Sequence, residues 1–189
     1  LSLIDPDAGT INYAYDASGR LTKQTDNKGI VTEMKYNTLG QLYQKILNSK
    51  TTTYEYYTSG STKGMTKKIT DPNGSYFSYE YDSYGRTLKT TQHIDATISD
   101  IIFQYAYNSY GYLTKVTYPE NFVINRYYDS YGNLTSVKNG SIAIWTLNTA
   151  TATSYKYTLG NGIVTEKKFD SNGMLSSINS KYIASGDRQ

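Results

Sequence analysis

The sequence predicts an all-β fold of repeated antiparallel β-hairpins that form a continuous, spiralling sheet, and three observations favour it. A seven-residue phrase of the form Tyr-Asp-x-x-Gly-x-Leu recurs along the 189 residues. The segments between its copies alternate apolar and polar residues with a period of two, which is typical of β-strands. The 38% hydrophobic content includes 22 tyrosines, so phenol rings must supply much of the apolar contact. Self-similarity at a period of about 20–50 residues indicates stacked repeats.

Six copies of the phrase define the repeat, and they begin at Tyr15, Tyr36, Tyr81, Tyr107, Tyr128 and Phe169. Two steps are 21 residues and one is 26, while the gaps of 45 and 41 residues are each close to two steps. A residue that recurs in every repeat is more often structural than catalytic. We therefore assign a structural role to the motif positions, which are Tyr15, Asp16, Gly19, Leu21, Tyr36, Gly40, Leu42, Tyr81, Asp82, Gly85, Tyr107, Gly111, Leu113, Tyr128, Asp129, Gly132, Leu134, Phe169, Asp170, Gly173 and Leu175.

Each position of the phrase has a physical interpretation. The tyrosine ends a strand, where its ring can pack across to a neighbouring strand. The following Asp or Asn can accept a backbone N–H two residues on, as an Asx turn. The glycine allows a positive φ, and the leucine begins the next strand with an apolar residue. The phrase is thus a hairpin turn with the two strand ends attached.

The first hairpins follow in order along the chain. Residues 20–25 are expected to be extended, residues 26–29 to turn, and residues 30–36 to be extended again before the turn at 37–40. The stretch 29–36 recurs with two differences at 162–169.

The later hairpins are predicted in the same way. Strands are expected at 66–70 and 75–81 around the turn Asp71-Pro72-Asn73-Gly74, and at 113–118 and 122–128 around Pro119-Glu120-Asn121. Residues 57–65 are interpreted as an inserted Gly/Ser/Thr-rich turn in a gap without a good copy of the phrase. Because no linker divides the chain, residues 1–189 are expected to form one array of about fourteen to sixteen strands, counting two per repeat.

Composition excludes several classes of function. The net charge is only +3 with scattered lysines, so the row of cations that neutralises phosphates is missing and no nucleic-acid partner is expected. There is no cysteine, which excludes disulfides and thiolate metal sites. The apolar runs are too short for a transmembrane segment. The chain opens and closes within repeat sequence, so we interpret it as a fragment of a longer protein.

Few residues offer chemistry. The periodic carboxylates of Asp16, Asp82, Asp129 and Asp170 could act as acid–base pairs or calcium ligands, but an Asx turn repeated in each hairpin is favoured. His93 is the only histidine, so catalysis by a nucleophile–histidine pair would depend on a residue in a Thr-rich stretch. Trp145 could stack on a sugar, although packing is the commoner role of such a residue. No cofactor, metal or enzymatic activity is expected.

These residues resemble the Rhs/YD-repeat family. The first copy, from Tyr15 to Leu21, fits the family phrase fully, and the copy from Tyr128 to Leu134 has its common Asn alternative. The stretch with Trp145, Gly160-Asn161-Gly162 and Phe169-Asp170 is similar to a longer unit of bacterial Rhs proteins. Copy three departs from the phrase, with Thr87 where leucine is usual.

The resemblance implies a scaffold rather than an enzyme. Family members wind such hairpins into a hollow shell, and bacterial members enclose a C-terminal toxin domain and deliver it outside the cell. The partners so implied are flanking repeats and an enclosed toxin domain, and the location is secreted or cell-surface. The alternative is a glycan-binding or adhesion module, because such modules also stack aromatic, Gly-rich hairpins of about this length. Such modules usually have a tryptophan or a tyrosine pair in each repeat, whereas here Tyr56-Tyr57 and Tyr127-Tyr128 are the only tyrosine pairs and tryptophan occurs once.

Overall fold

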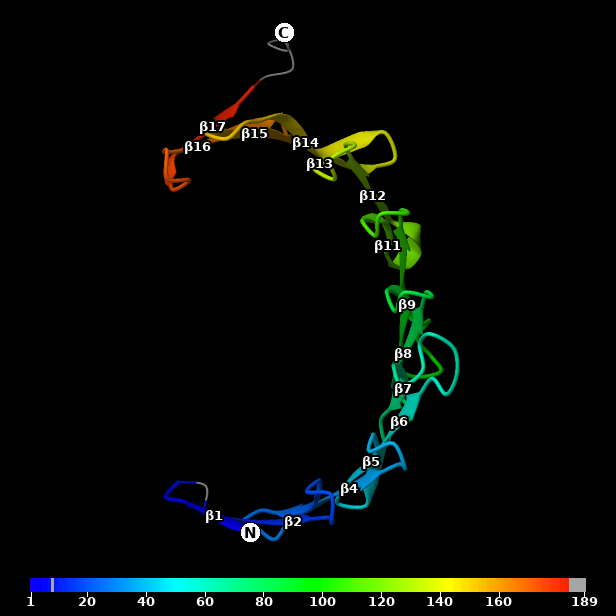
Figure 1. Ribbon diagram of the computed structural model, residues 1–189. Coiled ribbons are helices and arrows are strands. Elements are labelled where there is room, and N and C mark those ends of the chain that lie inside the picture. The colour runs from blue at the N-terminus through cyan, green and yellow to red at the C-terminus, as the bar shows by residue number, and fades with distance from the viewer. Residues whose placement is uncertain (8, 184–189) are drawn as a thin grey trace. The chain divides into compact units, whose positions relative to one another are not determined.

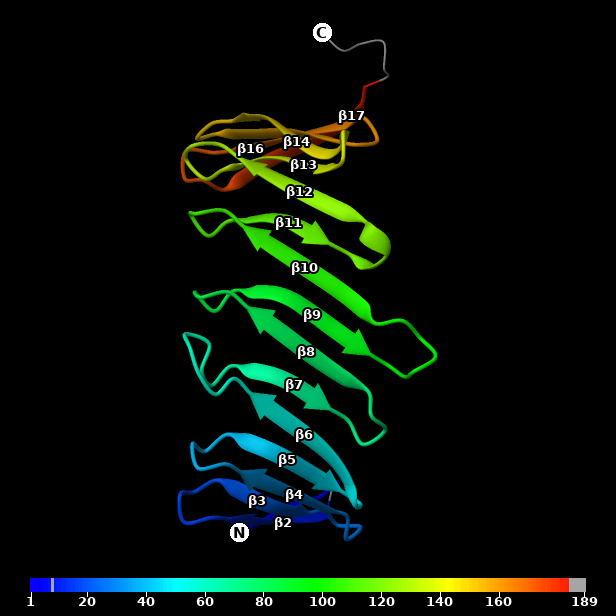
Figure 2. The same ribbon diagram turned by 90° about the vertical axis from the view of Figure 1, so that its right-hand side faces the viewer.

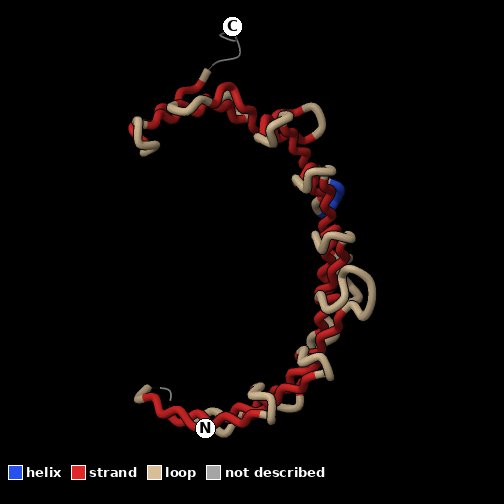
Figure 3. The backbone as a smooth tube through the Cα atoms, viewed as in Figure 1, coloured by secondary structure: helices blue, strands red, loops and turns tan. Residues whose placement is uncertain are grey.

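The computed structural model describes residues 1–7 and 9–183, which form antiparallel β-hairpins with almost no helix. Within this part of the chain there are seventeen strands and one short 3₁₀ helix (Figure 1). Strands and turns alternate along the whole described backbone (Figure 3). The prediction of an all-β hairpin repeat is therefore confirmed, with slightly more strands than the fourteen to sixteen expected.

The strand bounds agree closely with those expected from the period-two pattern. The strands are β1 (Ser2–Asp5), β2 (Gly9–Tyr15), β3 (Leu21–Thr25), β4 (Val31–Tyr36), β5 (Leu42–Leu47), β6 (Lys50–Tyr56), β7 (Thr66–Thr70), β8 (Tyr76–Tyr81), β9 (Thr87–His93), β10 (Ile101–Tyr107), β11 (Leu113–Thr117), β12 (Val123–Tyr128), β13 (Leu134–Asn139), β14 (Ile142–Ala150), β15 (Ser154–Leu159), β16 (Ile163–Phe169) and β17 (Leu175–Tyr182). The 3₁₀ helix η1 (Pro119–Asn121) lies between β11 and β12, where a plain turn was expected.

The chain divides into two compact units, Leu1–Ile102 and Phe103–Gln189. In the first unit each strand from β1 to β9 pairs with its sequence neighbour. In the second unit the strands from β10 to β17 pair in the same sequential way. The expectation that residues 1–189 act as one array stays a prediction.

Every hairpin that carries the repeat phrase shares one register. A β-bulge precedes the motif tyrosine, which then pairs with the residue at the motif's leucine position, as Tyr15 does with Leu21 and Tyr36 with Leu42. In copy three the partner of Tyr81 is Thr87, so Thr87 occupies the leucine position despite its polar side chain. In the first unit the turns joining β2 to β3, β4 to β5 and β8 to β9 lie along one edge (Figure 2).

Neither unit has a thick hydrophobic core. Among the described residues only Val116, Ile124 and Val164 are buried apolar side chains, and no large side chain is fully buried. Large apolar residues remain exposed along both units, from Leu3 and Ile4 in β1 to Ile178 in β17. The sheet in each unit is thus a single layer, whose stability depends on backbone ladders and cross-strand side-chain pairs.

Candidate functional site: the motif turns and a tyrosine-lined cleft

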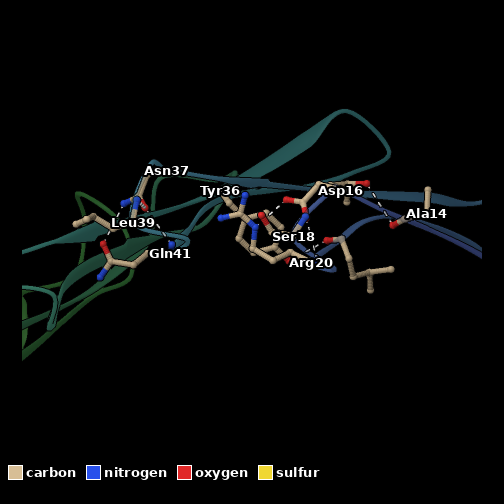
Figure 4. Close-up of polar contacts among 10 residues, drawn as sticks. Ala14, Asp16, Ser18, Arg20, Tyr36, Asn37, Leu39 and Gln41 are labelled. Carbon is tan, nitrogen blue, oxygen red and sulfur yellow. Dashed lines mark hydrogen bonds and ion pairs between the residues drawn. The ribbon is translucent and has the colours of Figure 1, made fainter.

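The first motif turn shows how the phrase closes a hairpin (Figure 4). The Oδ1 atom of Asp16 accepts the backbone N–H of Ser18 at 2.9 Å and that of Arg20 at 3.0 Å. Its Oδ2 atom accepts Nε–H of Arg20 at 2.7 Å. The backbone N–H of Asp16 donates to the Arg20 carbonyl, and that of Gly19 donates to the Asp16 carbonyl. The carboxylate therefore accepts three of the hydrogen bonds that close the turn, and the backbone supplies two more.

The other five copies use the same pattern. In each, the Asp or Asn side chain accepts the backbone N–H groups two and four residues on, at 2.9–3.1 Å. In three of these copies the second side-chain atom also finds a partner four residues on, which is Arg86 for Asp82, Gln41 for Asn37 and Asn133 for Asp129. The acceptor residues of these five turns are Asn37, Asp82, Asn108, Asp129 and Asp170.

These hydrogen bonds hold three motif carboxylates in the charged form. The backbone N–H of Arg20, helped by the Arg20 guanidinium and the Ser18 N–H, lowers the pKa of Asp16. The side-chain amide and backbone N–H of Asn133 lower the pKa of Asp129. For Asp82 partial burial raises the pKa, but the hydrogen bonds from Arg86 outweigh burial and the pKa is lowered. Hydrogen bonds to the charged form explain all three shifts, so the carboxylates act as turn acceptors and not as proton donors.

The residue after the motif glycine reaches the next repeat. The Arg20 guanidinium lies over the Tyr36 ring, 5.0 Å from its centroid. Tyr112 takes the equivalent place in the second unit, where its ring stacks on Tyr128 with centroids 5.0 Å apart. A cation over a ring and a stacked ring pair are alternative ways to make the same contact between repeats.

The same side chains pass closely over the glycine of the next motif turn. A Cβ atom on Gly40 would lie 3.2 Å from the Arg20 guanidinium, and one on Gly132 would collide with the Tyr112 phenol. Gly132 also has a φ of +86°. Glycine is required at Gly132 for two independent reasons, its backbone conformation and the space that Tyr112 occupies.

A third contact between repeats comes from the motif tyrosine. The Tyr36 hydroxyl donates to the Leu21 carbonyl at 2.8 Å, and the Tyr128 hydroxyl donates to the Leu113 carbonyl at 2.9 Å. The donor lies fifteen residues after the acceptor in both cases, which is one hairpin later along the chain. The hydroxyl, which otherwise would need water, is thus satisfied by the preceding repeat.

The structure reveals a copy of the repeat that the sequence pattern missed. Tyr56 donates its hydroxyl to the Leu42 carbonyl at 2.7 Å and pairs with Thr66 after the usual bulge. An ideal Cβ atom placed on Gly64 would lie 3.5 Å from the Gln41 side chain of the preceding repeat. Tyr56, Gly64 and Thr66 therefore occupy the tyrosine, glycine and leucine positions, and the insertion lies inside the turn.

Two turns outside the repeat phrase are closed by different side chains. The Asp26 side chain accepts the N–H groups of Lys28 and Ile30, as a motif aspartate does, although it lies between β3 and β4. In the turn at Asp71-Pro72-Asn73-Gly74, Asn73 instead accepts the Ser75 N–H, at 3.1 Å. The residue at the start of a turn therefore does not by itself determine which side chain caps it.

The second unit contains a cleft of about 440 Å³ between two motif turns, and we call it the tyrosine cleft. It lies between the turns at 108–112 and 129–132, and residues 126–128 of β12 also line it. The lining includes Tyr110, Tyr112, Tyr128, Tyr131 and Arg126. The sequence indicated the pair Tyr127-Tyr128 alone; the other tyrosines would emerge from reading the same motif positions in successive copies.

The remaining candidates for chemistry form no catalytic arrangement in the described residues. His93 Nδ1 lies 2.7 Å from Asp100 Oδ1, and the His93 ring stacks on Tyr76 at 4.8 Å. Trp145 packs beside Tyr155 and Tyr157. Across residues 1–7 and 9–183 no group of three His, Asp or Glu side chains is arranged to hold a metal ion. The same residues include no helix long and apolar enough to cross a membrane.

The fold and the motif turns define an array of interlocked YD-type β-hairpins, and comparison with known proteins agrees. A family model described as RHS Repeat matches residues 15–53. The chain is 34% identical over 90 residues to the tRNA nuclease WapA of Bacillus subtilis strain 168 and to the tRNA3(Ser)-specific nuclease WapA of Bacillus spizizenii. These matches cover 45% of this chain and 4% of each relative.

Solved structures share the fold over nearly the whole chain. The Tc holotoxin pore of Photorhabdus luminescens aligns with a TM-score of 0.72 and 16% identity, covering 96% of this chain and 10% of that chain. The TcdB2-TccC3 complex aligns with a TM-score of 0.58 and 17% identity, covering 92% of this chain and 9% of that chain. The resemblance to the Rhs/YD-repeat family is therefore confirmed, and the solved structures show that the shared fold extends over nearly the whole chain.

Proposed function

We propose that this chain is a non-enzymatic segment of the wall of a YD-repeat shell, which encloses a C-terminal toxin or other cargo domain of a secreted bacterial Rhs-type protein. The observation that carries the proposal is the single-layer sheet, in which only three apolar side chains of the described residues are buried. A thin sheet that leaves apolar residues exposed suits a wall that continues into flanking repeats and has another chain segment beside it.

The contacts between repeats support the same proposal. A wall must keep its register over many hairpins, because a slip of one residue would exchange the two faces of a strand. The motif tyrosine hydroxyl, the residue after the motif glycine and the glycine itself each join one hairpin to the next. We propose this structural role for the motif residues, in place of catalysis. Secretion or display at the cell surface belongs to the proposal as well.

The names of the similar proteins, which are toxins and nucleases, also support the proposal. The solved neighbours include a Tc holotoxin pore, and the curated relatives are nucleases. This chain spans 4% of the relatives' length. If the activity of such a protein lies outside the repeats, the repeat segment would serve to enclose the active domain.

Limited proteolysis of the full-length gene product, followed by mass spectrometry, tests the proposal. The expected result is a C-terminal piece without repeats that stays bound to the repeat fragment and resists protease. The same piece expressed alone is the control, and it should be digested under identical conditions. A gene product in which the repeats end with nothing protected would overturn the shell and leave surface binding as the function to pursue.

A further inference from the structure

The tyrosine cleft carries more aromatic surface than the hairpins require. Tyr110 and Tyr131 are 83% and 88% exposed, and only their backbone N–H groups take part in the turns. Other copies place Ser18, Leu39 or Asn172 at this motif position and form the same turn. The two rings are therefore free to contact a ligand without loss of the fold.

The Tyr112 ring contacts both sides of the cleft. Its ring stacks on Tyr128 at 5.0 Å and lies 6.4 Å from the Tyr110 ring, centroid to centroid. It also packs against Gly132 of the facing turn. Tyr110, Tyr112 and Tyr128 thus form a connected row of rings, and the Tyr131 side chain contributes to the same cleft.

Arg126 and Asp129 are the charged side chains of the cleft lining. No carboxylate among the described residues forms an ion pair with Arg126, which lines the cleft. The carboxylate of Asp129 also lines the cleft. It already accepts hydrogen bonds from the backbone N–H groups of Tyr131 and Asn133 and from the side-chain amide of Asn133. Arg126 is therefore the charged group of the cleft whose hydrogen-bonding capacity is unused.

We propose that the tyrosine cleft is a binding site for an acidic saccharide, a pyranose unit that carries a carboxylate. The C–H groups on one side of a pyranose ring have partial positive charge and fit the electron-rich faces of Tyr110 and Tyr131. The guanidinium of Arg126 can hold a carboxylate through two parallel N–H···O bonds. A volume of about 440 Å³ suits one or two sugar units.

This ligand class fits better than the other anions that use aromatic clefts. Single-stranded nucleic acid requires a groove of cations beside the rings, whereas Arg126 is the one cationic side chain in the cleft lining. The inference rests on residues of the second unit and does not depend on the shell. Proteolysis tests the shell and sugar titration tests the cleft, so either proposal can fail while the other stands.

Titration of the 189-residue protein by NMR tests the site. The probes are trigalacturonate, a hyaluronan tetrasaccharide and sialyllactose, and the methyl ester of trigalacturonate is the uncharged control. We expect saturable shifts of the tyrosine-cleft amides with at least one acid, and affinity about tenfold lower for the ester. Affinity for the acid should also fall as salt is raised.

Variants distinguish the cleft from general adhesion. The double variant Tyr110→Ala/Tyr131→Ala should weaken binding by about tenfold or more, and Arg126→Gln should remove the preference for acid over ester. Tyr84→Ala is the matched control, because Tyr84 is 83% exposed at the same motif position in the first unit. The proposal is overturned if no acid gives saturable shifts, if acid and ester bind equally, or if Tyr84→Ala weakens binding as much as the cleft variant does.

Discussion

A motif turn concentrates several specific interactions in five residues, and the glycine is the position at which they meet. Its positive φ lets the chain reverse, and its missing side chain leaves room for the preceding repeat. The two requirements can be separated experimentally, because they coincide in some copies and not in others. Gly132 has both, whereas an ideal Cβ on Gly173 (φ +77°) meets no atom within 4 Å.

We predict that Gly132→Ala destabilises the second unit more than Gly173→Ala does. Both variants force alanine into a left-handed conformation, which costs about 1–2 kcal/mol. Gly132→Ala must in addition displace Tyr112 from its stack on Tyr128. Urea unfolding followed by tyrosine fluorescence measures both free energies. Equal losses would show that the contact of Tyr112 with Gly132 contributes nothing.

The motif carboxylates predict a dependence of stability on pH. The pKa of Asp129 is lowered in the folded protein, so its hydrogen bonds stabilise the fold fully above the ordinary pKa of about 3.9. That stabilisation is lost as pH falls through the lower, folded-state pKa. We expect the free energy of unfolding to decrease as the pH is lowered below about 4.

Asp129→Asn tests the origin of that decrease. The amide oxygen can still accept the N–H groups of Tyr131 and Asn133, as Asn37 and Asn108 do in their own turns. We expect the variant to fold at pH 7 and to lose less stability than the parent between pH 5 and 3, estimated from the ordinary carboxyl range. Thermal melts across this range provide the measurement, and an unchanged pH profile would assign acid sensitivity to other groups.

At the scale of the hairpin, one hydroxyl group joins successive repeats. We predict that Tyr36→Phe lowers the free energy of unfolding by about 0.5–1.5 kcal/mol, the usual loss for one hydrogen bond. The bond from Tyr36 to the Leu21 carbonyl is removed, while the ring stays under the Arg20 guanidinium. Amide exchange in β3 and β4 should show where the array opens.

Tyr15→Phe is the control for this variant. Tyr15 occupies the same motif position but is 46% exposed, and no hydrogen bond of its hydroxyl occurs in the described part of the chain. Its substitution should leave stability within about 0.5 kcal/mol of the parent. If both substitutions cost the same, the link between repeats would lie in the ring packing alone.

Elements that follow local chemistry could be predicted from the sequence, and those that depend on contact between repeats could not. The strands around Asp16 and Asp129 follow from alternation and from Asx-turn residues, which act over a few positions. The copy at Tyr56 was missed because its turn holds seven residues before Gly64 where the phrase has three. This copy is recognised from contacts with the preceding repeat, in which Tyr56 donates to the Leu42 carbonyl and Gly64 lies beside the Gln41 side chain.

The tyrosine cleft was hidden for the same reason. The sequence indicated Tyr127-Tyr128 as a pair, and both residues are part of the cleft lining. The rings that join them come from the turns of two successive repeats, at Tyr110, Tyr112 and Tyr131. Their proximity follows from the register of β11 and β12, which no spacing within one copy of the phrase reveals.

At the scale of the whole molecule, the exposed strands at the margins matter most. Every residue of β17 is exposed, including Leu175, Ile178 and Tyr182. Within the described residues of its unit, β17 pairs with β16 and with no other strand. An apolar strand with an open edge is a template for pairing with another chain. In a longer protein, a further hairpin would cover this edge.

We therefore predict that the 189-residue protein self-associates as its concentration rises, and that Ile178→Glu reduces this association. Ile178 pairs with Lys167 across β16 and β17, so a glutamate there gains an opposite charge within its own sheet while it makes the edge repel copies of itself. Sedimentation velocity over a concentration series measures the effect. A parent protein that stays monomeric at high concentration would contradict the open edge. Association that Ile178→Glu leaves unchanged would place the contact elsewhere, with β1 and its exposed Leu3 and Ile4 as the next strand to alter.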